Sequence, residues 1–167
     1  MRGAIGVLAL LSFGALATPP AAARVHEAGE AGFVIRLAAD VAATPDVAWR
    51  ELVRPAGWWD GQHTFSGDAA NLAIDPHAGG CFCEVLPNPD SPRAAPRGTV
   101  EHMRIVYAEQ GRLLRMAGGL GPLQSEGVSA TLTVAFKPVE GGTRILWEYV
   151  AGGYMRPKPA EIAPVVD

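Results

Sequence analysis

The chain has 167 residues, of which 49% are hydrophobic and 19% charged, and its formal net charge is -3. This length suits one domain with a sizeable core and is too short for two comfortable ones. The small negative charge, without a cluster of lysine and arginine, gives no reason to expect a nucleic-acid partner. The composition therefore indicates one ordinary globular domain.

The first 23 residues have the organisation of a Sec-type export signal. Arg2 forms a short positive region, residues 4–17 are apolar, and small residues lead up to a cleavage point after Ala23. An uncleaved membrane anchor is the competing interpretation, but the apolar run falls short of the ~20 residues that a span needs. We predict a signal peptide over 1–23, a periplasmic or secreted mature chain from Arg24, and no stable membrane span after cleavage.

A polar lead-in over 24–32 is expected to precede one domain over 33–167. Apolar residues alternate with others through 33–41, which is typical of a half-buried strand. Thr44 can cap a helix whose first turn contains Pro45, and apolar residues follow at helical spacing. These signals predict a strand followed by a short amphipathic helix.

Two adjacent tryptophans, Trp58 and Trp59, come just after Pro55 and Gly57 end this helix. Neighbouring side chains point in different directions in any regular structure. One tryptophan can therefore enter the core while the other lines a cavity or covers its mouth. We expect a short helical lid that carries aromatic side chains.

The rest of the domain is predicted to be an antiparallel sheet with short turns, so the fold class is expected to be α+β. A proline-rich, flexible loop is expected over 87–98. Alternating apolar residues, bounded by glycine and proline, predict strands at 63–67, 70–75, 81–86, 99–108, 112–118, 128–137 and 143–151.

Seven short motifs follow one another in a specific order: TPDVAW at 44–49, WWD at 58–60, HTFSG at 63–67, GGCFCE at 79–84, VEHM at 100–103, LGPLQ at 120–124 and GGT at 141–143. Together they resemble the SRPBCC superfamily of helix-grip folds, which includes START domains, polyketide cyclases and birch-pollen-allergen-like proteins. The most similar branch is that of the bacterial activator of heat-shock-protein ATPase homologues. The resemblance implies a curved antiparallel sheet closed by a long C-terminal helix, in a fold that hosts binding, transport and catalysis.

The end of the chain departs from that pattern. Pro157, Pro159 and Pro164 interrupt the region where the long helix is expected, and the sequence stops at Asp167. The C-terminal helix is therefore expected to be incomplete, either through truncation or because a partner takes its place. Such a sheet would expose an apolar face suited to self-association. The inward positions concerned include Leu132, Val134, Ile145 and Trp147.

Cys81 and Cys83 lie two residues apart on one predicted strand, so they share a face. A disulfide between them requires a distorted strand, and reduced, partly buried thiols are the preferred interpretation. Together with His77 they could bind zinc or copper(I), but a single upstream histidine lacks the paired spacings of known metal sites. No metal and no cofactor are predicted.

Glu101 and His102 are the candidate acid–base residues. Simple alternation places His102 on the face of Arg104 and Glu101 on the face of Met103, so one of the two must point inward. A titrating group in an apolar cavity could polarise a bound carbonyl or hydroxyl, although a paired structural residue is the simpler interpretation. The sequence carries no recognised nucleophile motif or phosphate-binding loop.

The preferred function is an exported protein that holds a small apolar or amphipathic ligand in a cavity between the sheet and the helices. One alternative is a cyclase- or dehydratase-like enzyme that uses His102 and Glu101 in the same cavity. Another is a co-chaperone-like protein-interaction module, against which the export signal argues. The expected ligand-binding residues are Trp58, Trp59, Phe65, Phe82, Glu84, His102, Met116, Leu120, Leu132, Trp147 and Tyr149.

Overall fold

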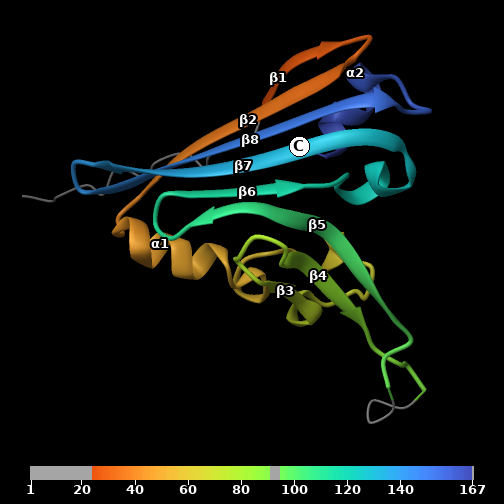
Figure 1. Ribbon diagram of the computed structural model, residues 1–167, viewed down its shortest axis with the longest axis horizontal. Coiled ribbons are helices and arrows are strands. Elements are labelled where there is room, and N and C mark those ends of the chain that lie inside the picture. The colour runs from red at the N-terminus through yellow and green to blue at the C-terminus, as the bar shows by residue number, and fades with distance from the viewer. Residues whose placement is uncertain (1–23, 91–94, 167) are drawn as a thin grey trace, which may run out of the picture.

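The computed structural model describes residues 24–90 and 95–166, which form one antiparallel sheet with short helices beside it. The strands are β1 (Arg24–Gly29), β2 (Gly32–Val41), β3 (Leu72–Ile74), β4 (Cys81–Leu86), β5 (Gly98–Glu109), β6 (Leu113–Ala117), β7 (Gly127–Val139) and β8 (Gly142–Tyr154). Their order across the eight-stranded sheet is β1-β2-β8-β7-β6-β5-β4-β3. Figure 1 shows the sheet twisting from β1 and β2 at one edge to β3 and β4 at the other.

The fold is mostly β, so the predicted α+β helix-grip class is wrong. α1 (Pro45–Leu52) has 8 residues and α2 (Pro159–Ile162) has 4, and no long helix crosses the sheet within the described residues. The prolines explain the short ending, because a 3-10 turn, η5 (Ala163–Val165), replaces further α-helix directly after α2. The last turns contact β1 and β2 instead of lying across the sheet.

α1 forms where the sequence predicts it, and its apolar side packs on the sheet. The Thr44 hydroxyl accepts a hydrogen bond from the Val47 N–H, and a proline occupies the first turn. Trp49 is buried and its ring centroid lies 5.8 Å from that of Phe136 on β7. The helix therefore covers part of the inner face, beside β7 and β8.

Most predicted strands are confirmed, and the range 81–86 coincides with β4. The strand expected at 63–67 is wrong, because this stretch begins with the 3-10 turn η2 (Gly61–His63) and continues in bends. The Asp60 carboxylate caps that turn by accepting the Gln62 N–H. The lead-in is also more ordered than expected, because β1 pairs with β2.

The inner face of the sheet is largely buried, which corrects the expectation of an open apolar patch. Val134 is 0% and Leu132 7% exposed, while Ile145 and Trp147 are half-buried. Self-association of the chain stays a prediction, but these residues do not supply a broad exposed surface for it. The remaining inner-face core residues include Phe33, Ile35, Met103, Ile105, Leu114, Met116, Ala130, Phe136, Tyr149 and Ala151.

The predicted signal peptide, residues 1–23, lies outside the described residues. Within the part of the chain that is described, no helix is long and apolar enough to cross a membrane.

Candidate functional site

A buried carboxylate and a buried imidazole meet on the inner face of the sheet. Glu84 on β4 is 1% exposed and His102 on β5 is 7% exposed. The Nε2 atom of His102 lies 2.9 Å from Oε2 of Glu84. Both residues were predicted for the site from the sequence.

Glu84 also anchors the segment that follows the tryptophan pair. Its Oε2 accepts a hydrogen bond from the Phe65 N–H at 3.1 Å, and its Oε1 accepts one from the Ser66 N–H. Both carboxylate oxygens are therefore engaged, and residues 61–67 are tied to β4. Sequence reasoning selected Glu84, Phe65 and His102 separately, but it did not predict that one carboxylate joins all three.

The electrostatic state of Glu84 follows from these contacts. Burial alone would raise the pKa of Glu84, but hydrogen bonds from Ser66, from the Phe65 amide and from His102 outweigh burial and lower it. Glu84 is therefore ionised at neutral pH and can only accept hydrogen bonds. It follows that the Nε2–H group of His102 donates a hydrogen bond to Oε2 of Glu84.

A β-bulge in β5 decides which way His102 points. Phe82 pairs with Met103 and the next residue, Cys83, pairs with Glu101, so His102 is an extra residue on β5. His102 and Met103 are consequently both buried, although they are neighbours in sequence.

The face assignment made from simple alternation is therefore wrong for this part of β5. Glu101 faces outward, where its Oε2 accepts a hydrogen bond from Arg104 at 2.9 Å. The candidate acid–base pair of Glu101 and His102 is not brought together; His102 pairs with Glu84 instead. Alternation cannot reveal a bulge, because the extra residue is defined only by the pairing with β4.

The two adjacent tryptophans are held in different ways beside the pair. Trp58 donates from Nε1 to the carbonyl of Glu51 at 3.1 Å, and Trp59 donates to that of His63 at 3.1 Å. Their ring centroids lie 5.4 Å apart, and the Trp58 centroid lies 5.9 Å from that of Trp147 on β8. Trp58 remains 44% exposed, whereas Trp59 is half-buried.

Aromatic contacts continue from the tryptophans to the buried pair. The ring centroid of Phe82 lies 5.3 Å from that of Trp59 and 4.8 Å from that of His102. Phe65 approaches His102 from the loop, at 5.8 Å between centroids, and is 52% exposed. We call Trp58, Trp59, Phe65, Phe82 and Trp147 the aromatic cluster.

The other predicted ligand-binding residues lie in or beside the hydrophobic core. Met116, Leu132 and Tyr149 are buried, and Leu120 is half-buried. The Tyr149 hydroxyl accepts a hydrogen bond from the Leu120 N–H at 3.0 Å and lies 3.3 Å from the Gly118 carbonyl oxygen, to which it can donate. Tyr149 therefore holds the connection after β6 against the sheet through Leu120 and Gly118.

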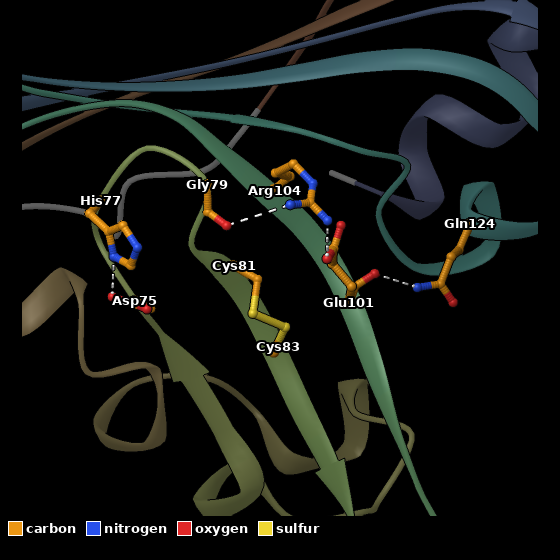
Figure 2. The surroundings of a disulfide bond; sticks show 8 residues. All are labelled: Asp75, His77, Gly79, Cys81, Cys83, Glu101, Arg104 and Gln124. Carbon is orange, nitrogen blue, oxygen red and sulfur yellow. Dashed lines mark hydrogen bonds and ion pairs between the residues drawn. A yellow bond between two sulfur atoms is a disulfide. The ribbon is translucent and has the colours of Figure 1, made fainter.

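The cysteines form a disulfide, so the preferred interpretation of reduced thiols is wrong. Figure 2 shows the Cys81–Cys83 bridge along β4, beside Glu101 and Arg104. His77 is directed to Asp75, with its Nδ1 2.6 Å from Oδ1 of that residue. Within the described residues, no group of three or more His, Cys, Asp or Glu side chains could hold a metal ion.

A surface hollow of about 520 Å³ lies at another part of the molecule. It is formed by the β1–β2 turn, the end of β8 and the segment that follows β8, and its lining includes Glu30, Tyr154, Arg156 and Lys158. None of its lining residues belongs to the aromatic cluster or to the Glu84–His102 pair. The hollow and the buried pair are therefore separate features.

Comparison with known proteins finds similar folds but no family. An uncharacterized protein from Rhizobium leguminosarum aligns over 89% of this chain and 90% of its own, with a TM-score of 0.52 and 14% identity. The Mll3558 protein from Rhizobium loti aligns over 80% of this chain and 88% of its own, with a TM-score of 0.51 and 16% identity. The MLL2253 protein from Mesorhizobium loti aligns over 78% and 83%, with a TM-score of 0.50 and 14% identity. These likenesses show the fold alone.

The family resemblance drawn from the motifs is corrected by these findings. No family model and no curated protein matches the chain. The described residues form a single eight-stranded antiparallel sheet and lack the long helix of a helix-grip fold. The strand predicted at 81–86 within the GGCFCE motif is observed, but the HTFSG motif at 63–67 does not form the predicted strand. The motifs did not establish the architecture or the family.

Proposed function

We propose that this protein is an exported binding protein that holds a small apolar or amphipathic molecule against the aromatic cluster. The observation that carries this proposal is the exposure of Trp58 and Phe65, at 44% and 52%. Phe65 contacts His102 of the buried Glu84–His102 pair directly, and Trp58 is connected to it through Trp59 and Phe82. Small-molecule sites are lined mainly by apolar and aromatic side chains together with a few polar groups.

The tryptophan side of the site is organised before any ligand arrives. Trp58 is held by its bond to the Glu51 carbonyl and by its edge contact with Trp147. Ordering side chains on binding costs free energy, so a ring that is already fixed binds more tightly than a mobile one. Trp58 accordingly offers an apolar surface at low entropic cost.

The Glu84–His102 pair supports the site by positioning Phe65. Glu84 accepts the Phe65 N–H, and His102 lies against the Phe65 ring. Because three donors already occupy the two carboxylate oxygens, Glu84 has little capacity left for proton transfer. The arrangement favours a positioning role over acid–base catalysis.

Export is proposed on the signal-like sequence over 1–23 and on the oxidised cysteines. The Cys81–Cys83 disulfide is consistent with an oxidising compartment, because disulfides persist there and are rare in the reducing cytosol. The periplasm or the extracellular medium is thus the proposed location.

Titration with dodecanoate and with anilinonaphthalene sulfonate tests the binding site. Both probes should shift the tryptophan emission, and Trp58→Ala or Phe65→Ala should each weaken binding about 2- to 10-fold, as expected for the loss of one aromatic contact. Tyr154→Ala is the matched control, because this tyrosine is 75% exposed and lines the separate hollow.

Unchanged affinity in a folded Trp58→Ala, Phe65→Ala double variant would overturn the proposal. Weaker binding caused by Tyr154→Ala alone would instead place the ligand in the hollow beside β1. Circular dichroism and a cooperative melt establish that each variant is folded.

A further inference from the structure

The Cys81–Cys83 disulfide and the bulge at His102 lie opposite each other in the sheet. The two cysteine Cα atoms are 5.4 Å apart, whereas two residues of an extended strand span about 6.6–6.8 Å. β4 is therefore shortened at the point where β5 carries an extra residue. A short stretch on one strand and a long stretch on its neighbour are two parts of one distortion.

The disulfide lies on the outer face of the sheet. Phe82, between the two cysteines, is 2% exposed and points inward, while both cysteines are half-buried on the other side. Cys81 pairs with Arg104, and Cys83 pairs with Glu101. Figure 2 shows the bridge alongside the ion pair of Glu101 and Arg104.

We propose that Cys81–Cys83 is a thiol–disulfide exchange site whose oxidation state sets the position of His102 against Glu84. The co-reactant is a small thiol. One thiolate attacks Sγ of Cys83, the S–S bond breaks, and Cys81 leaves as a thiolate. A second thiolate attacks the thiol-derived sulfur of the mixed disulfide and releases Cys83. Two small thiols are oxidised to one disulfide, and both cysteines take up protons from water.

The proposed order of attack rests on the strand register, which places Arg104 opposite Cys81 and Glu101 opposite Cys83. Arg104 lies opposite Cys81 across the ladder, and its guanidinium is hydrogen-bonded to the Glu101 carboxylate. A cation beside a cysteine stabilises its thiolate. Glu101 pairs with Cys83, and a nearby carboxylate disfavours a thiolate there. Because the more stable thiolate leaves faster, attack on Cys83 with release of Cys81 is the favoured route.

The position of the cysteines in sequence makes the bond exchangeable. A disulfide stabilises a protein mainly by restricting the unfolded chain, and this effect grows with the length of the closed loop. Only Phe82 separates the cysteines, so this loop is very short. The folded state accordingly gives the bond little protection against reduction.

Reduction of the disulfide should change the contacts of the aromatic cluster, because Phe82 is the residue between the two bridged cysteines. Its ring contacts both Trp59 and His102. Without the bridge β4 can extend, so Phe82 shifts and the bulge that turns His102 inward loses its support. This coupling is independent of the ligand proposed above.

Incubation of the folded protein with reduced glutathione tests the exchange. Mass spectrometry of quenched samples should find a mixed disulfide on Cys83 and then two thiols, with a change in tryptophan emission that oxidised glutathione reverses. Trp59→Phe should lose most of the emission change. The Cys81→Ser, Cys83→Ser double variant should resemble the reduced protein and show no response to glutathione.

Two results would overturn the proposal. The first is a disulfide that glutathione reduces only after the protein is unfolded in denaturant. The second is a reduced protein whose tryptophan emission and His102 imidazole resonances match those of the oxidised form. Both measurements use the wild-type chain, so they remain decisive if a cysteine variant fails to fold.

The alkylation rates of the two cysteines test which of them is the leaving group. At neutral pH, iodoacetamide should alkylate Cys81 in a Cys83→Ser variant several-fold faster than Cys83 in a Cys81→Ser variant. Arg104→Met should reduce this difference, whereas Arg115→Met, which removes an exposed arginine of β6, should not. A faster Cys83 would reverse the proposed order of attack.

Discussion

His102 and Glu84 meet at 2.9 Å between Nε2 and Oε2 because β5 contains one residue more than β4 at their crossing. Without this bulge, alternation would turn His102 outward and Glu101 inward. The bulge thus turns His102 from the exposed face to the buried face, where its imidazole acts as a hydrogen-bond donor. That donor completes the hydrogen bonding of Glu84, together with the amides of Phe65 and Ser66.

Glu84→Gln should destabilise the fold by about 1–3 kcal/mol, because buried donors lose a charged acceptor. The pKa of Glu84 is lower in the folded protein than in the unfolded chain, since the bonds from Ser66, Phe65 and His102 outweigh the effect of burial. Its carboxylate therefore stabilises the fold above the unfolded-state pKa, and this stability is lost as the pH falls through the folded-state pKa. Urea unfolding below about pH 4 should show this loss in wild type and a flatter profile in Glu84→Gln.

Glu101→Gln is the matched control for that change. Its carboxylate lies on the outer face of the sheet, is 46% exposed and pairs only with Arg104 among the ion pairs of the described residues. The variant should stay within about 1 kcal/mol of wild type and keep the acid dependence. An equal loss in both variants would show that the buried pair has no special role.

Trp49→Ala should cost about 3–5 kcal/mol, because it removes a large side chain from the contact between α1 and the sheet. Trp49 is 5% exposed and packs against Phe136. Trp58→Ala, at a position that is 44% exposed, should cost clearly less. Thermal melts of both variants measure the difference, and a reversed ranking would contradict the described packing of α1.

Gly32→Ala should destabilise the β1–β2 hairpin by about 1–3 kcal/mol through overpacking. A Cβ atom on Gly32 would overlap the backbone carbonyl of Ala151 on β8, which cannot rotate away. Gly29→Ala is the control, because a Cβ there meets no atom within 4 Å. Chemical denaturation should separate the two variants, and equal stabilities would argue against the close approach of β2 and β8 at this point.

Processing of the N-terminus is expected to produce a mature chain that begins near Arg24. The small residues before this position suit a signal peptidase, and the apolar stretch is shorter than a membrane span. N-terminal sequencing of the protein from a periplasmic or culture-medium fraction measures the cleavage point. Retention of Met1 on the exported protein would contradict the prediction.

Local pattern in the sequence was sufficient to locate most elements. Alternation predicted β4 at its observed bounds, and the cap at Thr44 with Pro45 predicted the start of α1. These predictions succeed because strand periodicity and helix capping depend on residues within a few positions of one another. Trp58 and Trp59 were selected for the same reason, since large apolar side chains next to a helix end are visible locally.

Only the tertiary structure decided how the site is assembled. The direction of His102 depends on the register between β4 and β5, and the Cys81–Cys83 bridge depends on the shortening of β4 at that register. Register is a property of two paired strands, so no periodicity within either strand reveals a one-residue offset. The same limit explains why the predicted helix-grip architecture was wrong. Local motifs indicate individual strands and turns, whereas which segments pack over the inner face of the sheet depends on residues far apart in the sequence.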